Sequence, residues 1–288
     1  MLLRYYRKID AYSGIRVFAA AVVAFAIIFS TGIGGWKEVI LSFGLGAVWL
    51  WLSWTLLRDR WVIKTSALRF MTFLLLAIYW SVEFEISTFL FYVLIVEVNW
   101  HLAENHKRKA SVLSVLHSGT LTALSSYWLP QETIYSMIGA LMIWFATGGI
   151  RFKTILQWLL AWCMIMAPMT YLMVKQGAEK VDLADAPFTW WVLPLVLMIV
   201  AVFEWVQSYL KANQKNKSRS IVGGLLIVIG GLMGWWFGSF FGISICLLGL
   251  SYHLANRLRY FKRQTIAEIL FAIVLTFIVV VHYDLIPW

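Results

Sequence analysis

The segment LIVEVNWHL, residues 94–102, places three polar side chains in an otherwise apolar run: Glu97, Asn99 and His101. A carboxylate and an imidazole four residues apart lie on the same face of an α-helix. A carboxylate removed from water has a raised pKa, and an imidazole titrates close to neutral pH. Because such a pair can bind a polar solute or relay protons, we take Glu97 and His101 as candidate binding residues.

Other ionisable residues fall at a similar depth when the chain is divided into membrane spans. They are Arg16, His117, Glu204, His253 and Glu268. Glu97 lies about 20 Å into its span from the outer side at the helical rise per residue, which is the cytoplasmic third of the membrane. Charged groups in hydrocarbon are costly unless they are paired or hydrated, and groups at one depth can pair. We therefore expect these residues to form a polar layer inside the bundle, with Arg16 as the countercharge of one carboxylate.

Two simpler interpretations of this polar layer stay open. Arg16, His101 and Glu268 are close enough to the inner membrane surface for their side chains to extend to it. Polar side chains also join neighbouring helices without any further role. Glu97 and Glu204 are the deepest acids, so they are the main functional candidates.

The composition predicts the elements that hold these residues. The chain has 288 residues, of which 61% are hydrophobic and 13% charged, against about 25% charged in soluble domains. Apolar runs of about 20 residues recur along its whole length, which is typical of a polytopic membrane protein. No segment has the form of a cleavable signal peptide. Cys163 and Cys246 both lie in apolar segments and lack metal-binding spacing, so we interpret them as small core residues.

The pattern predicts an all-α bundle of eleven spans, forming one integral-membrane domain over residues 1–288. The predicted spans are 12–33, 36–57, 66–82, 84–103, 111–129, 132–150, 154–174, 189–210, 220–238, 240–257 and 264–284. Residues 66–103 are too long for one span, and Glu83 and Glu85 lie in their middle, which favours a hairpin there. One long tilted helix is the alternative, but it would leave both carboxylates at mid-membrane.

The charges indicate the orientation of the spans. With a cytoplasmic N-terminus and an external C-terminus, every inner connection carries Lys or Arg, including Lys107, Arg108 and Lys109. The outer connections hold only Lys37, Lys175 and Lys180 as basic residues. This alternation follows the positive-inside rule, so the net charge of +10 reflects membrane topology and no nucleic-acid partner is expected. No connection exceeds about 15 residues, which leaves no room for a soluble domain.

Short-range patterns add a few structural expectations. The segments beginning HLAENH at His101 and HLANRL at His253 suggest a weak parallel repeat of about 12–129 with 154–284. Gly230 and Gly234 have the four-residue spacing of closely packed membrane helices, with a hinge as the alternative. Hydroxyl side chains cluster in residues 111–130, but no nucleophile, metal or phosphate-binding motif accompanies them. No catalytic residue, metal or cofactor is therefore expected.

These features favour a permease-like protein of a bacterial-type plasma membrane. It would move, or help a partner to move, a small or lipidic solute, with proton coupling through Glu97 and Glu204. A non-catalytic membrane subunit that packs against a partner protein is the first alternative, and an intramembrane lipid-modifying enzyme is the second. The expected partners are the lipid bilayer, anionic lipid at the cytoplasmic face and a membrane protein.

Overall fold

The computed structural model describes residues 36–55, 86–148, 151–176, 189–211, 214–260 and 264–282, with isolated positions 15, 19, 22, 26, 72, 73, 76 and 77. Within these residues the chain forms only helices, which confirms the all-α prediction. The predicted spans 12–33 and 66–82, and Glu83 and Glu85, lie outside the described residues apart from those isolated positions.

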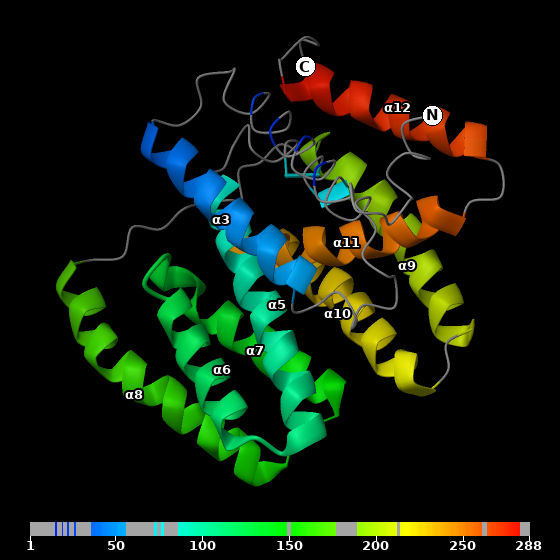
Figure 1. The fold of residues 1–288 in the computed structure, drawn as a ribbon. Helices are drawn as coiled ribbons and strands as arrows, with labels where there is room; N and C mark the ends of the chain where they lie inside the picture. The colour runs from blue at the N-terminus through cyan, green and yellow to red at the C-terminus, as the bar shows by residue number, and fades with distance from the viewer. Residues whose placement is uncertain are drawn as a thin grey trace.

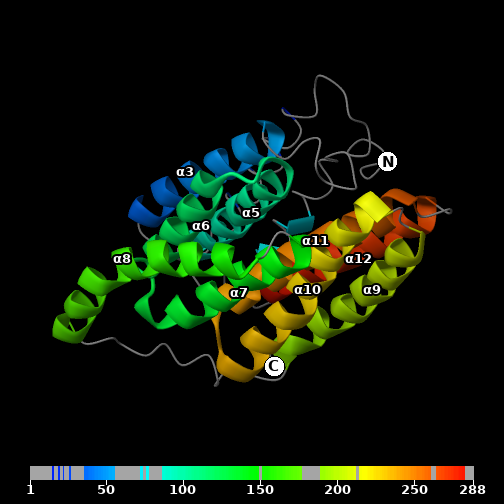
Figure 2. The same cartoon turned by 90° about the horizontal axis from the view of Figure 1, so that it is seen from below.

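The described helices follow one another along the chain (Figures 1 and 2). They are α3 (Trp36–Thr55), α5 (Ile86–Lys109), α6 (Val112–Ser125), the 3₁₀ turn η1 (Pro130–Glu132), α7 (Thr133–Thr147), α8 (Phe152–Gln176), α9 (Thr189–Lys211), α10 (Gln214–Phe237), α11 (Phe240–Tyr260) and α12 (Gln264–His282). Each α-helix overlaps one predicted span. In Figure 2 most of them run in roughly the same direction.

The lengths of the helices differ from the predicted spans. Of the described helices, two are long and apolar enough to cross a membrane on length and composition alone, at Ile86–Lys109 and Ser220–Phe237. Helices α6 and α7 have only 14 and 15 residues, or roughly 22 Å at the helical rise, whereas a hydrocarbon core is about 30 Å thick. The number of eleven spans therefore stays a prediction.

Local interactions explain where several helices begin and end. The Ser111 hydroxyl accepts the Ser114 N–H at 3.4 Å and caps the start of α6. Gly148 ends α7 in the left-handed conformation, with φ of 71°, as glycine does at many helix ends. Ser239 caps α11 by accepting the Gly242 N–H at 3.0 Å.

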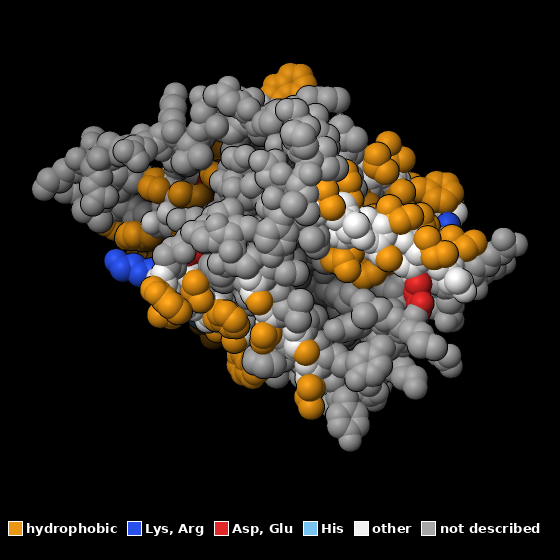
Figure 3. Space-filling model, turned by 90° about the horizontal axis from the view of Figure 1, so that it is seen from above, with side chains coloured by type: hydrophobic (Ala, Val, Ile, Leu, Met, Phe, Trp, Pro, Cys, Tyr) orange, Lys and Arg blue, Asp and Glu red, His pale blue; other side chains and the backbone are white. Residues whose placement is uncertain are grey.

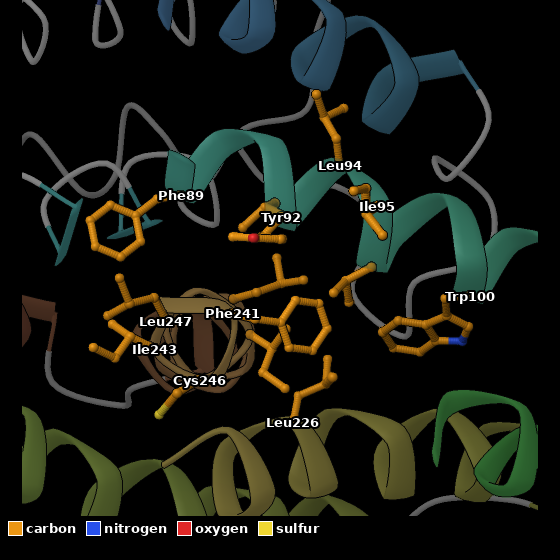
Figure 4. Close-up of a cluster of buried hydrophobic side chains, with 14 of the residues drawn as sticks. Phe89, Tyr92, Leu94, Ile95, Trp100, Leu226, Phe241, Ile243, Cys246 and Leu247 are labelled. Carbon is orange, nitrogen blue, oxygen red and sulfur yellow. The ribbon is translucent and has the colours of Figure 1, made fainter. Parts of the chain in front are cut away.

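Helix α5 lies at the centre of the described fold and contacts α3, α6, α7 and α11. Phe89, Tyr92 and Ile95 of α5 point toward α11, which is seen end-on in Figure 4. The rings of Tyr92 and Phe241 meet edge to face, with centroids 5.4 Å apart. This aromatic and aliphatic cluster is the largest buried core among the described residues.

Glycines allow two helix pairs to approach closely. A Cβ at Gly119 of α6 would lie 2.5 Å from the Trp158 carbonyl oxygen of α8. A Cβ at Gly230 of α10 would lie 2.6 Å from Ile245 Cγ1 and 2.7 Å from the Cys246 nitrogen of α11. The predicted packing role of Gly230 is therefore confirmed.

Candidate functional site: polar groups inside the bundle

A polar stripe runs along α5 through Glu97, His101 and Asn105, which are spaced four residues apart. Glu97 is only 1% exposed, whereas His101 and Asn105 are half-buried nearer the end of the helix. His101 Nε2 and Asn105 Nδ2 lie 3.0 Å apart in a hydrogen bond. The stripe thus connects a buried carboxylate with the end of α5 that carries Lys107, where the helix reaches the surface.

Glu204 of α9 is buried and binds the end of α11. Its Oε1 accepts hydrogen bonds from Asn256 Nδ2 at 2.7 Å and from the Ser208 hydroxyl at 3.1 Å. The half-exposed Arg257 guanidinium lies 3.5 Å from Oε2. Ser208 is on the Glu204 face of α9, as the sequence spacing predicts. Glu204 therefore joins two helices through polar contacts with Asn256 and Arg257, and these contacts do not include Glu97.

His253 of α11 is buried beside α10. A Cβ at Gly223 would lie 2.9 Å from its Nε2 atom, and its ring meets that of Tyr252 at 90° with centroids 5.0 Å apart. Neither ring nitrogen forms a hydrogen bond with the part of the chain that the structure describes. His253 thus fills a space opened by a glycine. It lies one turn before the residues that bind Glu204, so these two predicted residues share a level of the bundle.

The remaining predicted residues are distributed differently. His117 is exposed on α6, and Glu268 is half-buried on α12. Arg16 lies outside the described residues, so its predicted pairing with a carboxylate stays a prediction. The interior position on α6 is taken by Ser118, because consecutive residues of a helix point about 100° apart. The structure therefore places His117 on the outer face of α6, not in the predicted interior layer.

Sequence reasoning missed a buried network centred on Ser118. The Ser118 hydroxyl donates a hydrogen bond to Asn99 Oδ1 of α5. It accepts the indole N–H groups of Trp144 at 2.8 Å and Trp158 at 2.9 Å. Asn99 Nδ2 also donates to Thr122 Oγ1 at 3.2 Å. The network joins α5, α6, α7 and α8, and all five side chains are at most 1% exposed.

The hydrogen bonds of Ser118 decide its chemistry. Its hydroxyl already donates one bond and accepts two, which uses all its hydrogen-bonding capacity. A nucleophilic serine requires a base that accepts its proton, but the proton of Ser118 is directed to an amide oxygen. Ser118 is therefore a structural group. The Asn99–Ser118 pairing had one signal in the sequence, the group of hydroxyl residues in 111–130.

Two acids at the outer ends of predicted spans, Glu38 and Glu132, also bond across helices. Glu38 accepts the Ser87 N–H at 2.9 Å and the Ser87 hydroxyl at 2.8 Å, at the first turn of α5. Glu132 accepts the Phe240 N–H at 2.8 Å at the first turn of α11. Each carboxylate thus lies at the N-terminal, positive end of a helix. These two helices, α5 and α11, start on the same side of the bundle.

Burial raises the pKa of Glu132 above its usual range. Hydrogen bonds from the Ser239 hydroxyl and from the Phe240 and Phe241 N–H groups oppose this rise.

No group of three or more His, Cys, Asp or Glu side chains suited to a metal ion occurs among the described residues. Comparison of the chain with protein-family models, with curated proteins and with solved structures finds no match.

Proposed function

We propose that the chain is a polytopic integral membrane protein of a bacterial-type plasma membrane, with eleven spans and a cytoplasmic N-terminus. The exposed faces of the helices support this proposal. On α8 every fourth residue is a large exposed apolar side chain: Phe152 (76%), Leu156 (51%), Leu160 (61%) and Met164 (70%). On the face seen in Figure 3, most of the coloured side chains are hydrophobic. A soluble helix would expose its polar side instead, and large apolar surfaces mark membrane contact.

The contacts between connections support the proposed topology. Lys107 Nζ lies 3.8 Å from the position of a Cβ at Gly148. Lys107 belongs to a predicted inner connection, and Gly148 lies near the inner end of the predicted span 132–150. Glu132, at the outer end of the predicted span 132–150, meets Ser239 of a predicted outer connection. An error of one span would bring basic and acidic connections together. The observed pairings therefore agree with the alternation of charge.

We further propose that the protein is permease-like and that the stripe of Glu97, His101 and Asn105 carries its polar cargo or its coupling proton. The observation that supports this role is the gradient of exposure along one face of α5, from a carboxylate that is 1% exposed to half-buried residues near the basic end. An ionisable residue inside a membrane helix is costly and is usually functional. Glu204, in contrast, binds α11, so we assign it to packing.

A second candidate, a membrane subunit without transport activity, is favoured by a separate observation. Glu38, Glu132, Glu204 and Ser118 all use their polar atoms in bonds between helices. A bundle fixed in this way suits a protein that packs against a partner. The enzyme alternative has less support, because the Ser118 hydroxyl is fully hydrogen-bonded.

Reconstitution into vesicles tests the permease proposal. Purified protein is placed in liposomes that contain a pH-sensitive dye, and pools of amino acids, sugars, nucleosides, organic acids and fluorescent phospholipids are added in turn. We expect flux with at least one pool, and a loss of about a hundredfold in Glu97→Gln, as for removal of a proton-transfer group.

Glu104→Gln is the matched control, because Glu104 is on the same helix but pairs with Arg108 at 3.9 Å near the surface. Its flux should stay close to that of the unaltered protein. Equal flux in Glu97→Gln and Glu104→Gln would refute the assigned role of Glu97. The absence of flux with every pool would favour the subunit alternative.

A further inference from the structure

The fold brings two basic connections together on the predicted inner side. One begins in the last turn of α5 with Lys107, Arg108 and Lys109, and the other leads into α8 with Arg151 just before the helix and Lys153 in its first turn. All five side chains are exposed. We call these five residues the basic patch. The sequence separates its two halves by more than 40 positions, so their proximity is a property of the fold.

Helix direction places both halves of the patch at the same level. Gly119 of α6 packs against Trp158 of α8, and further along the same helices Ala123 packs with Met166. Because the residue numbers of the two contacts increase together along α6 and α8, the helices run parallel. They therefore begin side by side. Their first turns therefore add the partial positive charge of two helix N-termini to the patch.

The position of Lys107 joins the two halves. Its Nζ lies 3.8 Å from the position of a Cβ at Gly148, three residues before Arg151. The turn after α5 is held by the Ala110 N–H, which donates to the His106 carbonyl at 2.7 Å, and by the 2.9 Å bond between His106 Nδ1 and the Ser111 carbonyl. The ammonium is thus presented from an ordered turn.

Among the residues that the structure describes, one acid, Glu104, pairs with the patch, through Arg108 at 3.9 Å. The patch therefore carries an excess of positive charge, which attracts anionic partners. Three large apolar side chains, Val112, Leu113 and Phe152, are exposed beside the basic residues. A ligand that combines an anionic group with apolar chains matches both features, whereas a free phosphate would match only the charge.

We propose that the basic patch binds the phosphate headgroup of an anionic phospholipid, with Val112, Leu113 and Phe152 against its acyl chains. A lipid with two phosphate groups fits best, because the basic side chains come from two adjacent turns. This inference rests on the membrane placement proposed above, but it does not depend on solute transport or on Glu97.

Native mass spectrometry of the full chain in detergent tests the site with cardiolipin, phosphatidylglycerol and phosphatidylcholine as probes. The test variant combines Lys107→Gln, Arg151→Gln and Lys153→Gln. The control combines Lys211→Gln, Lys215→Gln and Lys217→Gln, which removes the same number of charges from another predicted inner connection. We expect cardiolipin binding to fall by about a hundredfold in the test variant, since each basic residue near an anionic lipid surface contributes about fivefold to binding. The control should bind like the unaltered protein.

Several outcomes would overturn the lipid site. Equal losses in the two triple variants would show a general charge effect, and equal binding of phosphatidylcholine would show that the charge is irrelevant. Inorganic phosphate that raises the melting temperature as much as cardiolipin would indicate a free anion site. If the triple variant does not fold, Arg151→Gln alone is measured, with an expected loss of about fivefold; unchanged binding there refutes the proposal.

The lipid and permease proposals fail separately. Loss of lipid binding without loss of solute flux would support the site as a lipid contact alone. Normal lipid binding in a protein without Glu97-dependent flux would refute only the permease role. Absence of both anionic lipid binding and flux in the unaltered protein would overturn both proposals.

Discussion

The Oε1 atom of Glu132 accepts the backbone N–H of Phe240 at 2.8 Å, which fixes the connection before α7 to the first turn of α11. Its Oε2 atom accepts the Ser239 hydroxyl at 2.5 Å and the Phe241 N–H at 3.2 Å. The first N–H groups of a helix have no partner within the helix. Glu132 supplies a hydrogen-bond acceptor for these N–H groups from a segment more than 100 residues away.

Glu132→Ala should therefore destabilise the protein. The change leaves buried donors at the start of α11 without their acceptor, and we expect the free energy of unfolding to fall by about 2–3 kcal/mol. Thermal unfolding of the purified protein in detergent measures the effect. Glu104→Ala, which removes a partly exposed surface pair, should cost less than about 1 kcal/mol; equal losses would contradict the assigned role of Glu132.

Glu132 should also give the stability a dependence on pH. Because burial raises its pKa above the ordinary value of 4.5, the folded protein binds more protons than the unfolded chain between 4.5 and the raised pKa. The contribution of Glu132 to stability is then greatest below pH 4.5 and declines as pH rises through the folded pKa. We expect the melting temperature of the unaltered protein to fall relative to that of Glu132→Gln as the pH rises from mildly acidic to neutral. Parallel pH profiles would refute it.

Ser118→Ala should separate structural from catalytic roles of the buried serine. It removes the acceptor of the Trp144 and Trp158 indoles and the donor to Asn99, so we expect a loss of about 2–4 kcal/mol in the free energy of unfolding. Ser126→Ala is the matched control, because the Ser126 hydroxyl is equally buried but forms no hydrogen bond. Its stability should stay the same or rise. A stable Ser118→Ala protein would show that the network does not hold the helices together.

Gly230→Ala should weaken the packing of α10 on α11. The added methyl group would lie 2.7 Å from the backbone nitrogen of Cys246, which cannot move aside easily, so we expect a destabilisation of about 1–3 kcal/mol. A Cβ at Gly44 in α3 has no atom within 4 Å, and Gly44→Ala should stabilise its helix by up to about 1 kcal/mol. Melting temperatures of the two variants should move in opposite directions. A shift of the same sign in both would contradict the packing argument.

The sequence was sufficient to predict the helices of the described residues, because each is a long apolar run and charged connections mark the ends of these runs. The predicted span 189–210 corresponds to α9 at Thr189–Lys211, and the predicted break after residue 238 corresponds to the start of α11 at Phe240. The packing of Gly230 also followed from spacing alone. These features are local, so a single sequence contains them.

The pairing of distant groups did not follow from the sequence. Nothing local indicates that Glu132 meets Ser239 rather than another outer connection. On α6, His117 points outward and the adjacent Ser118 points inward. The hydroxyl residues Ser114, Ser118 and Thr122 recur every four residues on the buried face, but this spacing does not indicate which neighbouring helices they meet. The sequence thus identified polar residues at depth without showing which of them bond to one another.

Helix α11 is bonded near both of its ends by carboxylates that precede it in the chain, Glu132 at Ser239 and Phe240 and Glu204 at Asn256. During synthesis both acids emerge before their donors. A chain that stops before Ser239 therefore retains two interior carboxylates without these partners. The polar contacts that join them to α11 await the synthesis of that helix, and we expect a prematurely terminated chain to be less stable than the full one.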